Sequence, residues 1–370
     1  MKDKVKIWPP FIFIFIVAMS AGCSSLKDTV IKNDEKREQR DKAESELTKE
    51  VVLSEKEIEL EDGLSAVKYD GDYGFDEFIR QGGASSDAEV AAFLAQYLMI
   101  GKEELTFLGE VFGCSTISVK NSDEETLFGR NFDWENCDAL VAGTEPEDGY
   151  ASISTVNMGF IRQGAGAGGI ALLSPEVRKI AALYAPLDGM NEKGLCVAVN
   201  MIQDASTIEQ NTEKPDITTT TAVRLLLNKA ADVEEAIALL EQYDMHGSMG
   251  MMVHFALADS SGRSVVVEYI ENEMIVMDTP VVTNFYLSPG EKNGIGTDQS
   301  HTRYEILTEQ LNQTPLMNME DVKNALDSVS KDNFGEFEST EWSIVFNQSS
   351  KEVRYYHREN YKDSYTFYIK

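Results

Sequence analysis

The chain has 370 residues and 42% of them are hydrophobic, so it can bury a sizeable core and is not a disordered protein. Its 63 acidic residues against 33 basic ones give a formal net charge of -30. This charge argues against a nucleic-acid partner, because phosphates need a basic surface, and it disfavours attachment to an anionic membrane by electrostatics alone.

The first residues have the pattern of an export signal. Three lysines precede an apolar run over residues 11–19, which is too short to span a bilayer, and small residues lead from it to Cys23. This arrangement resembles a bacterial lipobox. It predicts a lipoprotein signal peptide over residues 1–22 and a lipid on Cys23 that anchors an exported protein to a membrane. An ordinary secretory peptide with an incidental cysteine is the alternative, and it predicts export as well.

Residues 23–60 are rich in charge and contain no aromatic side chain, which predicts a solvated tether without a fold of its own. In the next segment, 61–113, apolar residues recur at helical spacing over residues 88–99. Ser85 to Asp87 can supply the N-cap of this helix and Gly101 its stop. The apolar face has no partner earlier in the chain, so we expect the helix to dock on a later part of the chain.

From Cys114 onward the pattern changes to strands. Residues 115–120 and 126–133 read as two strands around a turn-forming sequence, which predicts a hairpin. A turn centred near Asp123 pairs residues whose numbers sum to about 246, so Cys114 lies opposite Phe132. Arg130 to Asp133 then fold back beside Cys114.

The remaining pattern alternates between blocks of strands and pairs of helices, which predicts an α+β sandwich of sheets and helices. The sequence around 188–191 is turn-like and leads into the next strand. The predicted strands are 195–201, 253–258, 264–270, 274–277, 281–284, 343–346, 353–357 and 365–369, and the predicted helices are 221–229, 233–243, 302–311 and 319–328.

Four cysteines are too few for a disulfide framework in an exported protein. A bridge between Cys137 and Cys196 is possible, although nothing in the spacing supports it, and Cys137 is interpreted as structural. One thiol can stay free because it reacts. We interpret Trp134 and Trp342 as core or pocket wall, and the sequence predicts no cofactor and no metal.

The neighbours of Cys114 suit a nucleophile. A guanidinium at Arg130 favours the thiolate, and a carboxylate at Asp133 can hold a cationic amine. If the bond between Gly113 and Cys114 is cut, Cys114 gains a free α-amino group whose ordinary pKa of about 7.7–8.0 suits a general base. Nucleophile and base are then one residue, and none of the four histidines has the setting of a Cys–His partner.

Several short blocks occur together in a characteristic order. They are Gly113-Cys114-Ser115, 128–133, 189–195 through Asn200, 282–284, 302–304 and 342–345. In this order they resemble the choloylglycine hydrolase family of linear amide hydrolases, which includes bile salt hydrolases and penicillin V acylases. The resemblance runs from Cys114 to near the C-terminus.

The resemblance implies an N-terminal nucleophile hydrolase domain over residues 114–370, folded as a four-layer αββα sandwich of antiparallel sheets. It implies that Cys114 is nucleophile and base, that Arg130 tunes the thiolate and that Asp133 orients the new amino group. Asn200 and Asn284 correspond to the family's oxyanion and amine-positioning asparagines. Arg303 corresponds to its second active-site arginine.

The long segment before Cys114 is similar to that of relatives with propeptides that cut themselves. Residues 61–113 are therefore expected to be propeptide-like, and the fragment either stays attached as a separate subunit or leaves. The substrate is expected to be a small-molecule amide. Loops 161–174 and 202–218 are expected to line its pocket.

Three functions remain open on the sequence. The first is hydrolysis of a non-peptide amide through a thioester on Cys114, and the second is acyl transfer from the same thioester to an amine. The third is a lipoprotein that only binds a ligand, which needs neither processing before Cys114 nor a reactive thiol.

Overall fold

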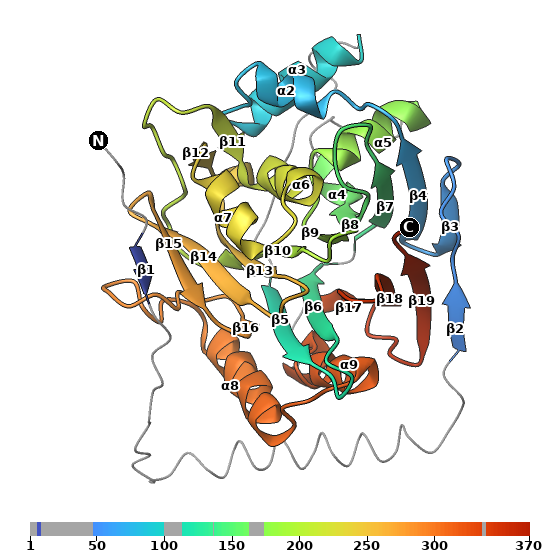
Figure 1. Cartoon of the computed structure of the whole chain (residues 1–370), viewed down its shortest axis with the longest axis vertical. Helices are drawn as coiled ribbons and strands as arrows, with labels where there is room; N and C mark the ends of the chain where they lie inside the picture. Colours follow the sequence, from blue (N-terminus) through green and yellow to red (C-terminus); the bar gives the residue numbers. More distant parts are fainter. Residues whose placement is uncertain (1–5, 9–46, 100–112, 136, 163–173, 335–337) are drawn as a thin grey trace.

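The computed structural model describes residues 6–8, 47–99, 113–135, 137–162, 174–334 and 338–370. Cys23 and most of the predicted signal peptide lie outside the described residues. Two β-sheets face each other, and helices cover their outer sides (Figure 1). The predicted α+β sandwich with four layers is therefore confirmed.

The larger sheet has ten strands and is antiparallel except at two pairs, β1 with β15 and β4 with β7. In spatial order its strands are β1 (Lys6–Trp8), β15 (Glu273–Asp278), β14 (Ser264–Ile270), β13 (Met252–Ala258), β10 (Cys196–Ile202), β9 (Asp188–Asn191), β8 (Ser152–Asn157), β7 (Ala139–Glu145), β4 (Leu64–Asp70) and β3 (Ile58–Glu61).

The second sheet has seven strands and is antiparallel except where β2 joins β19. Its spatial order is β16 (Val281–Val282), β5 (Gly113–Lys120), β6 (Thr126–Trp134), β17 (Ser339–Asn347), β18 (Glu352–His357), β19 (Asp363–Tyr368) and β2 (Leu47–Glu50). A separate pair of short strands consists of β11 (Asp216–Thr218) and β12 (Asp244–His246).

The helices divide between the two outer sides of the sandwich. On the larger sheet α6 packs against β9 and β10, and on the second sheet α8 and α9 pack against β5 and β6 (Figure 1). No helix among the described residues is both long and apolar enough to cross a membrane. The helices are α2 (Phe75–Arg80), α3 (Asp87–Tyr97), α4 (Met158–Arg162), α5 (Pro175–Leu183), α6 (Thr219–Lys229), α7 (Val233–Leu240), α8 (Asp298–Gln313) and α9 (Met319–Ser328), with 3₁₀ turns at η3 (Ser248–Gly250) and η4 (Lys331–Phe334).

The predicted hairpin and its register are confirmed. Strands β5 and β6 pair antiparallel, with Cys114 opposite Phe132 and Thr116 opposite Arg130. The turn contains the predicted residues, and the side chain of Asn121 accepts hydrogen bonds from the backbone of Asp123 and Glu125. Because this turn fixes the register locally, the sequence alone was sufficient to place the hairpin.

The turn-like sequence 188–191 instead forms the buried strand β9, between β8 and β10. The strands pack closely at Gly189, where a Cβ atom would lie 2.6 Å from the carbonyl oxygen of Ile153. This close packing requires a glycine. A glycine required by close packing and a glycine required by a turn look the same in the sequence.

The expectation of an unfolded tether through residue 60 was wrong for its last part. From Leu47 onward the chain enters the sheets, because β2 pairs with β19 and β3 forms a hairpin with β4. In β3 the two glutamates are exposed while Ile58 and Leu60 are half-buried. Charged residues on the solvent side of an edge strand gave this segment the composition of a tether.

Segment 61–113 is also part of the sandwich in its described portion. Strand β4 pairs in parallel with β7 along its whole length, so it lies inside the larger sheet. The predicted docking helix is α3, capped by Ser86. Its Phe93 packs against Phe78 and Tyr184, with ring centroids 5.2 and 6.1 Å away.

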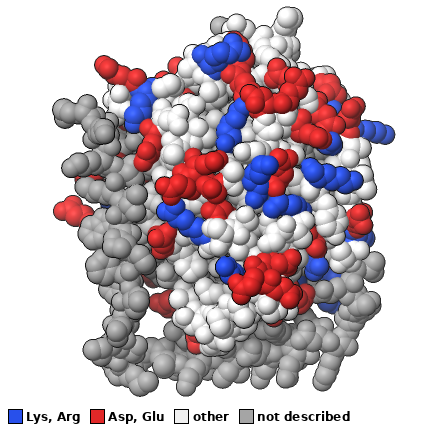
Figure 2. All heavy atoms as spheres, in the orientation of Figure 1, with Lys and Arg blue, Asp and Glu red and all other residues white. Residues whose placement is uncertain are grey.

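Charged side chains of both signs lie on the surface, as the composition predicts. On the face in Figure 2, acidic and basic side chains are interspersed and the basic ones form no continuous stripe. The core lies between the two sheets and beneath the helices, and includes Phe132, Trp342, Val199 and Leu226.

Candidate active site

Cys114 is the second residue of β5 and is fully buried between the two sheets. Its Sγ lies 3.7 Å from the carbonyl oxygen of Val199 on β10. Its backbone N–H donates to Oδ1 of Asn284 at 2.7 Å. The register of β16 on β5 brings Asn284 level with Cys114, because Val282 pairs with Thr116 and each further residue on one strand meets an earlier one on the other.

Arg130 lies on the same face of the second sheet as the Cys114 side chain. Arg130 is opposite Thr116 in the hairpin, and Thr116 is two residues after Cys114, so all three side chains point to one face. Its guanidinium donates to Oδ1 of Asn200 at 2.5 Å and to the carbonyl oxygen of Val199 at 3.0 Å. Its Nε donates to Oδ2 of Asp188 at 2.9 Å. The thiol and the guanidinium thus meet the same short stretch of β10.

Asp133 lies on the opposite face of the same sheet, towards α8. Its Oδ1 accepts from the hydroxyl of Thr340 at 2.7 Å, and its Oδ2 is 3.3 Å from a guanidinium nitrogen of Arg303. Gly113, its cross-strand partner, has no room for a side chain, since a Cβ atom would lie 2.9 Å from Oδ2 of Asp133 and 3.1 Å from Cε of Lys331. The Asp133 carboxylate is therefore next to the peptide bond before Cys114.

Arg303 connects the backbone of Cys114 to Asn284. It lies on α8, which is capped by Thr297. One guanidinium nitrogen donates to the carbonyl oxygen of Cys114 at 2.6 Å and to Oγ of Ser115 at 2.7 Å. The other donates to Oδ1 of Asn284 at 2.8 Å, so this oxygen accepts hydrogen bonds from both Cys114 and Arg303.

The structure brings all six residues predicted from the sequence into one buried cluster. Asn200 and Asn284 differ in how tightly their amide nitrogens are held, because Nδ2 of Asn284 donates to Met201 O at 2.6 Å, whereas Nδ2 of Asn200 is 3.5 Å from Val282 O. Their chemical roles stay predictions. The six residues are Cys114, Arg130, Asp133, Asn200, Asn284 and Arg303.

Sequence reasoning missed Asp188, which is fully buried against Arg130. The same carboxylate oxygen, Oδ2, also accepts from the indole nitrogen of Trp342 at 2.9 Å. Trp342 stacks on Phe132 with ring centroids 4.0 Å apart, so it is core, as predicted. Only the position of Asp188 beside a buried arginine identifies it, and no local sequence pattern carries that information.

The thiol of Cys114 is protonated at neutral pH while the chain is uncut. Burial raises the pKa of Cys114 to about 11, the guanidinium of Arg130 opposes this rise, and Asp133 adds to it. A buried thiol of this kind is a poor nucleophile unless a nearby base accepts its proton.

A cavity of about 300 Å³ lies beside Gly113 and Asn284. One of its lining residues, Gln203, comes from the loop at 202–218 that was expected to line the pocket, whereas residues 163–173 of the other expected loop lie outside the described residues. The cavity is polar. Its lining is completed by Thr297, Asp298, Gln299, Ser300, Arg303, Lys331 and Glu338.

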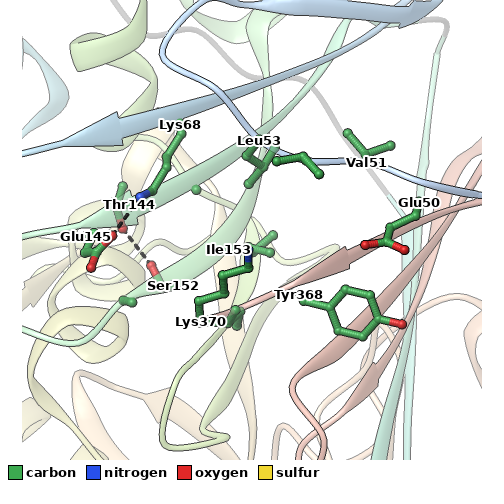
Figure 3. Close-up of a pocket in the computed structure, with 14 residues that line it drawn as sticks. Glu50, Val51, Leu53, Lys68, Thr144, Glu145, Ser152, Ile153, Tyr368 and Lys370 are labelled. Carbon is green, nitrogen blue, oxygen red and sulfur yellow. Dashed lines mark hydrogen bonds and ion pairs between the residues drawn. The ribbon is translucent and has the colours of Figure 1, made fainter.

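A second cavity of about 160 Å³ lies where the ends of β2, β4, β7 and β19 come together (Figure 3). It is formed where Glu50 to Leu53 meet Tyr368 to Lys370, with Lys68 paired to Glu145 on one wall. The strand ends that line it are the ends of β2, β4, β7 and β19, whereas Cys114 lies at the start of β5. It is therefore not the site of Cys114.

Cys137 and Cys196 belong to the hydrophobic core. Cys137 and Cys196 are free and buried, so the disulfide between them that was considered from the sequence does not form. Burial, followed by the carboxylate of Glu341, raises the pKa of the Cys137 thiol, and burial raises that of Cys196. Within the described residues no group of three or more His, Cys, Asp or Glu side chains is arranged to hold a metal ion.

The fold places the chain in a structural class. Two facing sheets covered by helices form the αββα sandwich of the N-terminal nucleophile hydrolase fold, and Cys114 lies near the start of an inner strand of that sandwich. Residues 114–289 match the model of linear amide C–N hydrolases of the choloylglycine hydrolase family. The resemblance predicted from the sequence is confirmed, and the enzymes of this family are hydrolases of linear amide bonds.

A solved structure supports the fold. Conjugated bile acid hydrolase from Clostridium perfringens superposes with a TM-score of 0.52 at 16% identity, covering 69% of this chain and 92% of that one. Penicillin V acylase from Agrobacterium tumefaciens gives a TM-score of 0.47 at 19% identity, covering 66% of this chain and 83% of that one.

A curated protein matches part of the sequence. Penicillin V acylase from Pectobacterium atrosepticum is 28% identical over 99 residues, which is 24% of this chain. The match spans about a quarter, 26%, of that protein's length.

Proposed function

We propose that this protein hydrolyses a linear, non-peptide amide with Cys114 as the nucleophile, after the chain is cut between Gly113 and Cys114. The observation that carries the proposal is the backbone nitrogen of Cys114, which Asn284 holds at 2.7 Å inside a buried cluster of two arginines and an aspartate. Cutting the chain converts this amide nitrogen into an amine without moving it from the cluster.

The cut itself uses the same groups. The Sγ atom of Cys114 adds to the carbonyl carbon of Gly113, the C–N bond breaks, and the nitrogen leaves as the amine of Cys114 with the thiol proton. Water then hydrolyses the resulting thioester, which gives a carboxylate on Gly113 and restores the thiol. The Asp133 carboxylate, adjacent to Gly113, stabilises the amine as it becomes cationic.

Substrate hydrolysis repeats these steps on another carbonyl. The free amine of Cys114 accepts the thiol proton, Sγ attacks the substrate carbonyl, and the proton passes to the departing amine. The Nδ2 atom of Asn200, which is weakly held at 3.5 Å, is available to donate to the oxyanion. Water then releases the acyl group from the thioester.

The direct test is mass spectrometry of the purified protein combined with an amidase assay. We expect a fragment that begins at Cys114, and we expect the Cys114→Ala chain to stay uncut and inactive. A suitable substrate panel contains conjugated bile salts, penicillin V, N-acyl amino acids and N-acyl ethanolamines, and the first two follow from the names of the relatives. Full amidase activity in a chain that remains uncut would rule out this mechanism.

The fragment before Cys114 stays bound after the cut. Its strands β2 and β4 each pair with a strand that comes after Cys114, and its Gly83 touches β11 so closely that a Cβ atom would lie 1.9 Å from the carbonyl oxygen of Asp216. Arg358 donates to the carbonyl oxygen of Asp62 at 3.1 Å. Aromatic burial adds to these contacts at about 2 kcal/mol per fully buried side chain, for residues that include Tyr73, Phe75 and Phe78.

Retention can be tested separately from self-cleavage. In the Cys114→Ala chain, a protease sequence inserted after Met99 allows an added protease to make the cut. We expect both fragments to co-elute in gel filtration. Elution of the N-terminal fragment alone, with the remainder still folded, would show that it is a propeptide that leaves.

Export and lipid anchoring remain part of the proposal. The negative net charge gives no electrostatic attraction to an anionic membrane, so the link would come from a lipid on Cys23. We expect the protein in the membrane fraction with an acylated N-terminal Cys23, and the Cys23→Ala chain outside that fraction. A soluble wild-type protein with an unmodified Cys23 would contradict the anchor.

A further inference from the structure

A buried histidine and a buried glutamate lie in the larger sheet behind Asn200 and Asn284. His254 on β13 pairs directly across from Asn200 on β10. Its Nδ1 is 3.2 Å from Oε1 of Glu268 on β14, and both side chains are fully buried. Neither residue belongs to the six predicted from the sequence.

The hydrogen-bond partners of the ring show how it is held. The Nε2 atom of His254 lies 2.7 Å from the carbonyl oxygen of Thr283, which can only accept a hydrogen bond, so Nε2 is the donor. The Glu268 carboxylate also accepts from two backbone N–H groups, of Leu287 at 2.8 Å and Ser288 at 2.9 Å. Burial alone would raise the pKa of Glu268, but the bonds from His254, Ser288 and Leu287 outweigh it and lower that pKa. The ionised carboxylate therefore holds the ring at its Nδ1 side.

The pair holds both ends of the segment that carries Asn284. His254 binds the carbonyl group of Thr283, immediately before Asn284, and Glu268 binds the N–H groups of Leu287 and Ser288, shortly after it. Asn284 between them accepts the backbone N–H of Cys114.

We propose that His254, which Glu268 holds at Nδ1, is a positioning residue that sets the place of Asn284 against the backbone nitrogen of Cys114. This inference rests on the proposed function, because the position of Asn284 matters for catalysis only if that nitrogen becomes the base. Other charged groups contact the same asparagines, Arg130 at Asn200 and Arg303 at Asn284.

The first experiment compares two histidine variants. His254→Gln removes the contact between His254 and Glu268 behind Asn284. His246→Gln removes a matched histidine–carboxylate contact, with Asp216, in the separate two-stranded sheet. We expect His254→Gln to lower kcat by about ten- to a hundredfold with KM changed less than about threefold, because misplacement by about 1 Å affects the chemical step. We expect His246→Gln to leave both constants near wild type. A folded His254→Gln enzyme with unchanged kcat would overturn the proposal.

The second experiment reads the hydrogen bond of the ring directly and does not depend on a variant that folds. Nitrogen-15 NMR of histidine-labelled wild-type protein contains signals from only four histidines, and the other three can be assigned by substitution of His246, His301 and His357. We expect Nε2 of His254 to carry a proton that exchanges slowly with solvent, because Nε2 donates to the carbonyl oxygen of Thr283 inside the sheet. An Nε2 atom without a proton would overturn the proposal.

The two experiments separate this inference from the proposed function. If the chain shows no cleavage and no amidase activity, the proposed function fails, whatever the NMR signal of His254 shows. If the wild type is an active amidase and either His254→Gln keeps its kcat or Nε2 of His254 carries no proton, only the positioning inference fails.

Discussion

The Nε atom of Arg130 donates to Oδ2 of Asp188 at 2.9 Å, and both side chains are fully buried. Asp188 belongs to the larger sheet and Arg130 to the second, so this ion pair joins the two sheets beside Cys114. The remaining donors of Arg130 are thereby directed at Asn200 and Val199. A buried charge that lacks its partner is costly, so we expect the arginine to depend on Asp188 for its place.

Substitution of Asp188 tests this dependence. We expect Asp188→Ala to lower the free energy of unfolding by about 3–5 kcal/mol and to slow self-cleavage, because it leaves the Arg130 guanidinium buried without a counter-charge. Trp342→Phe is the matched control, since it removes the second donor to the same oxygen and leaves the ion pair. Its hydrogen bond is worth about 0.5–1.5 kcal/mol. Urea unfolding and the cleaved fraction would measure both, and equal losses in the two variants would contradict the prediction.

Removal of Asn284 should stop maturation. Asn284→Ala leaves the buried N–H of Cys114 without its acceptor, at a cost of about 1–3 kcal/mol, and frees one donor of Arg303. We expect the uncut chain to accumulate on a denaturing gel. Asn228→Ala serves as a control, because Asn228 is equally buried but binds Tyr73. That variant should be less stable yet fully cut. Complete cleavage of Asn284→Ala would be the contrary result.

Gly113 should be required for the cut. In Gly113→Ala the new Cβ atom would lie 2.9 Å from Oδ2 of Asp133, so the carboxylate must move away from the bond to be cut. We expect cleavage at least about tenfold slower, within the range that a displacement near 1 Å produces. Gly149→Ala controls for crowding alone. The new Cβ atom would approach Asn228 O to 3.0 Å in a loop that does not contact Cys114. Similar cleavage rates in both variants would disprove the requirement.

The reactivity of Cys114 should change with cleavage and with pH. Because burial raises the pKa of the thiol to about 11 in the uncut chain, its thiolate fraction is small at pH 7 and grows about tenfold per pH unit until that pKa is reached. In the cut chain the new amine can accept the proton, so we expect alkylation at pH 8 to be more than about tenfold faster.

Mass spectrometry of a partly cut sample compares both forms in one tube. Cys137 and Cys196 are internal references, because both are buried and their thiol pKa values are raised. We expect them to stay unlabelled in the native protein. Equal labelling of Cys114 in cut and uncut chains would show that the amine does not act as its base.

Gly83 should matter for the association of the two fragments. Gly82 and Gly83 both have positive φ angles, of 104° and 72°, but a Cβ atom on Gly82 meets nothing within 4 Å, whereas one on Gly83 overlaps Asp216 O. We therefore expect Gly83→Ala to destabilise the chain by about 1–3 kcal/mol more than Gly82→Ala. Thermal unfolding and gel filtration of the protease-cut protein would measure it. Equal behaviour would mean that this contact contributes nothing.

The six candidate residues could be predicted to lie together because each occurs in a block recognisable in the sequence. The hairpin placed Arg130 beside Cys114, and the structure confirms that register. Asp188 could not be predicted in this way. Its partner is 58 residues earlier on another sheet, and its own surroundings resemble a turn. A contact of this kind depends on how the sheets face each other, which no local pattern encodes.

The N-terminal segment shows the same limit. Its composition suggested a tether up to residue 60, yet β2 and β3 are edge strands whose charged residues face solvent. Their partners, β19 and β4, supply the missing hydrogen bonds. Composition indicates how much apolar surface a segment can bury. It does not indicate whether another part of the chain has an unpaired strand edge with which the segment can form hydrogen bonds.

By itself the sequence determined the local structure of this protein, including the hairpin register, the helix caps and the nucleophile candidate, because turns and caps depend on residues a few positions apart. Only the tertiary structure decided which polar groups meet: Asp188 with Arg130, Glu268 with His254, and Asn284 with the nitrogen of Cys114. These contacts join strands far apart in the chain, and the packing of the whole sandwich fixes them.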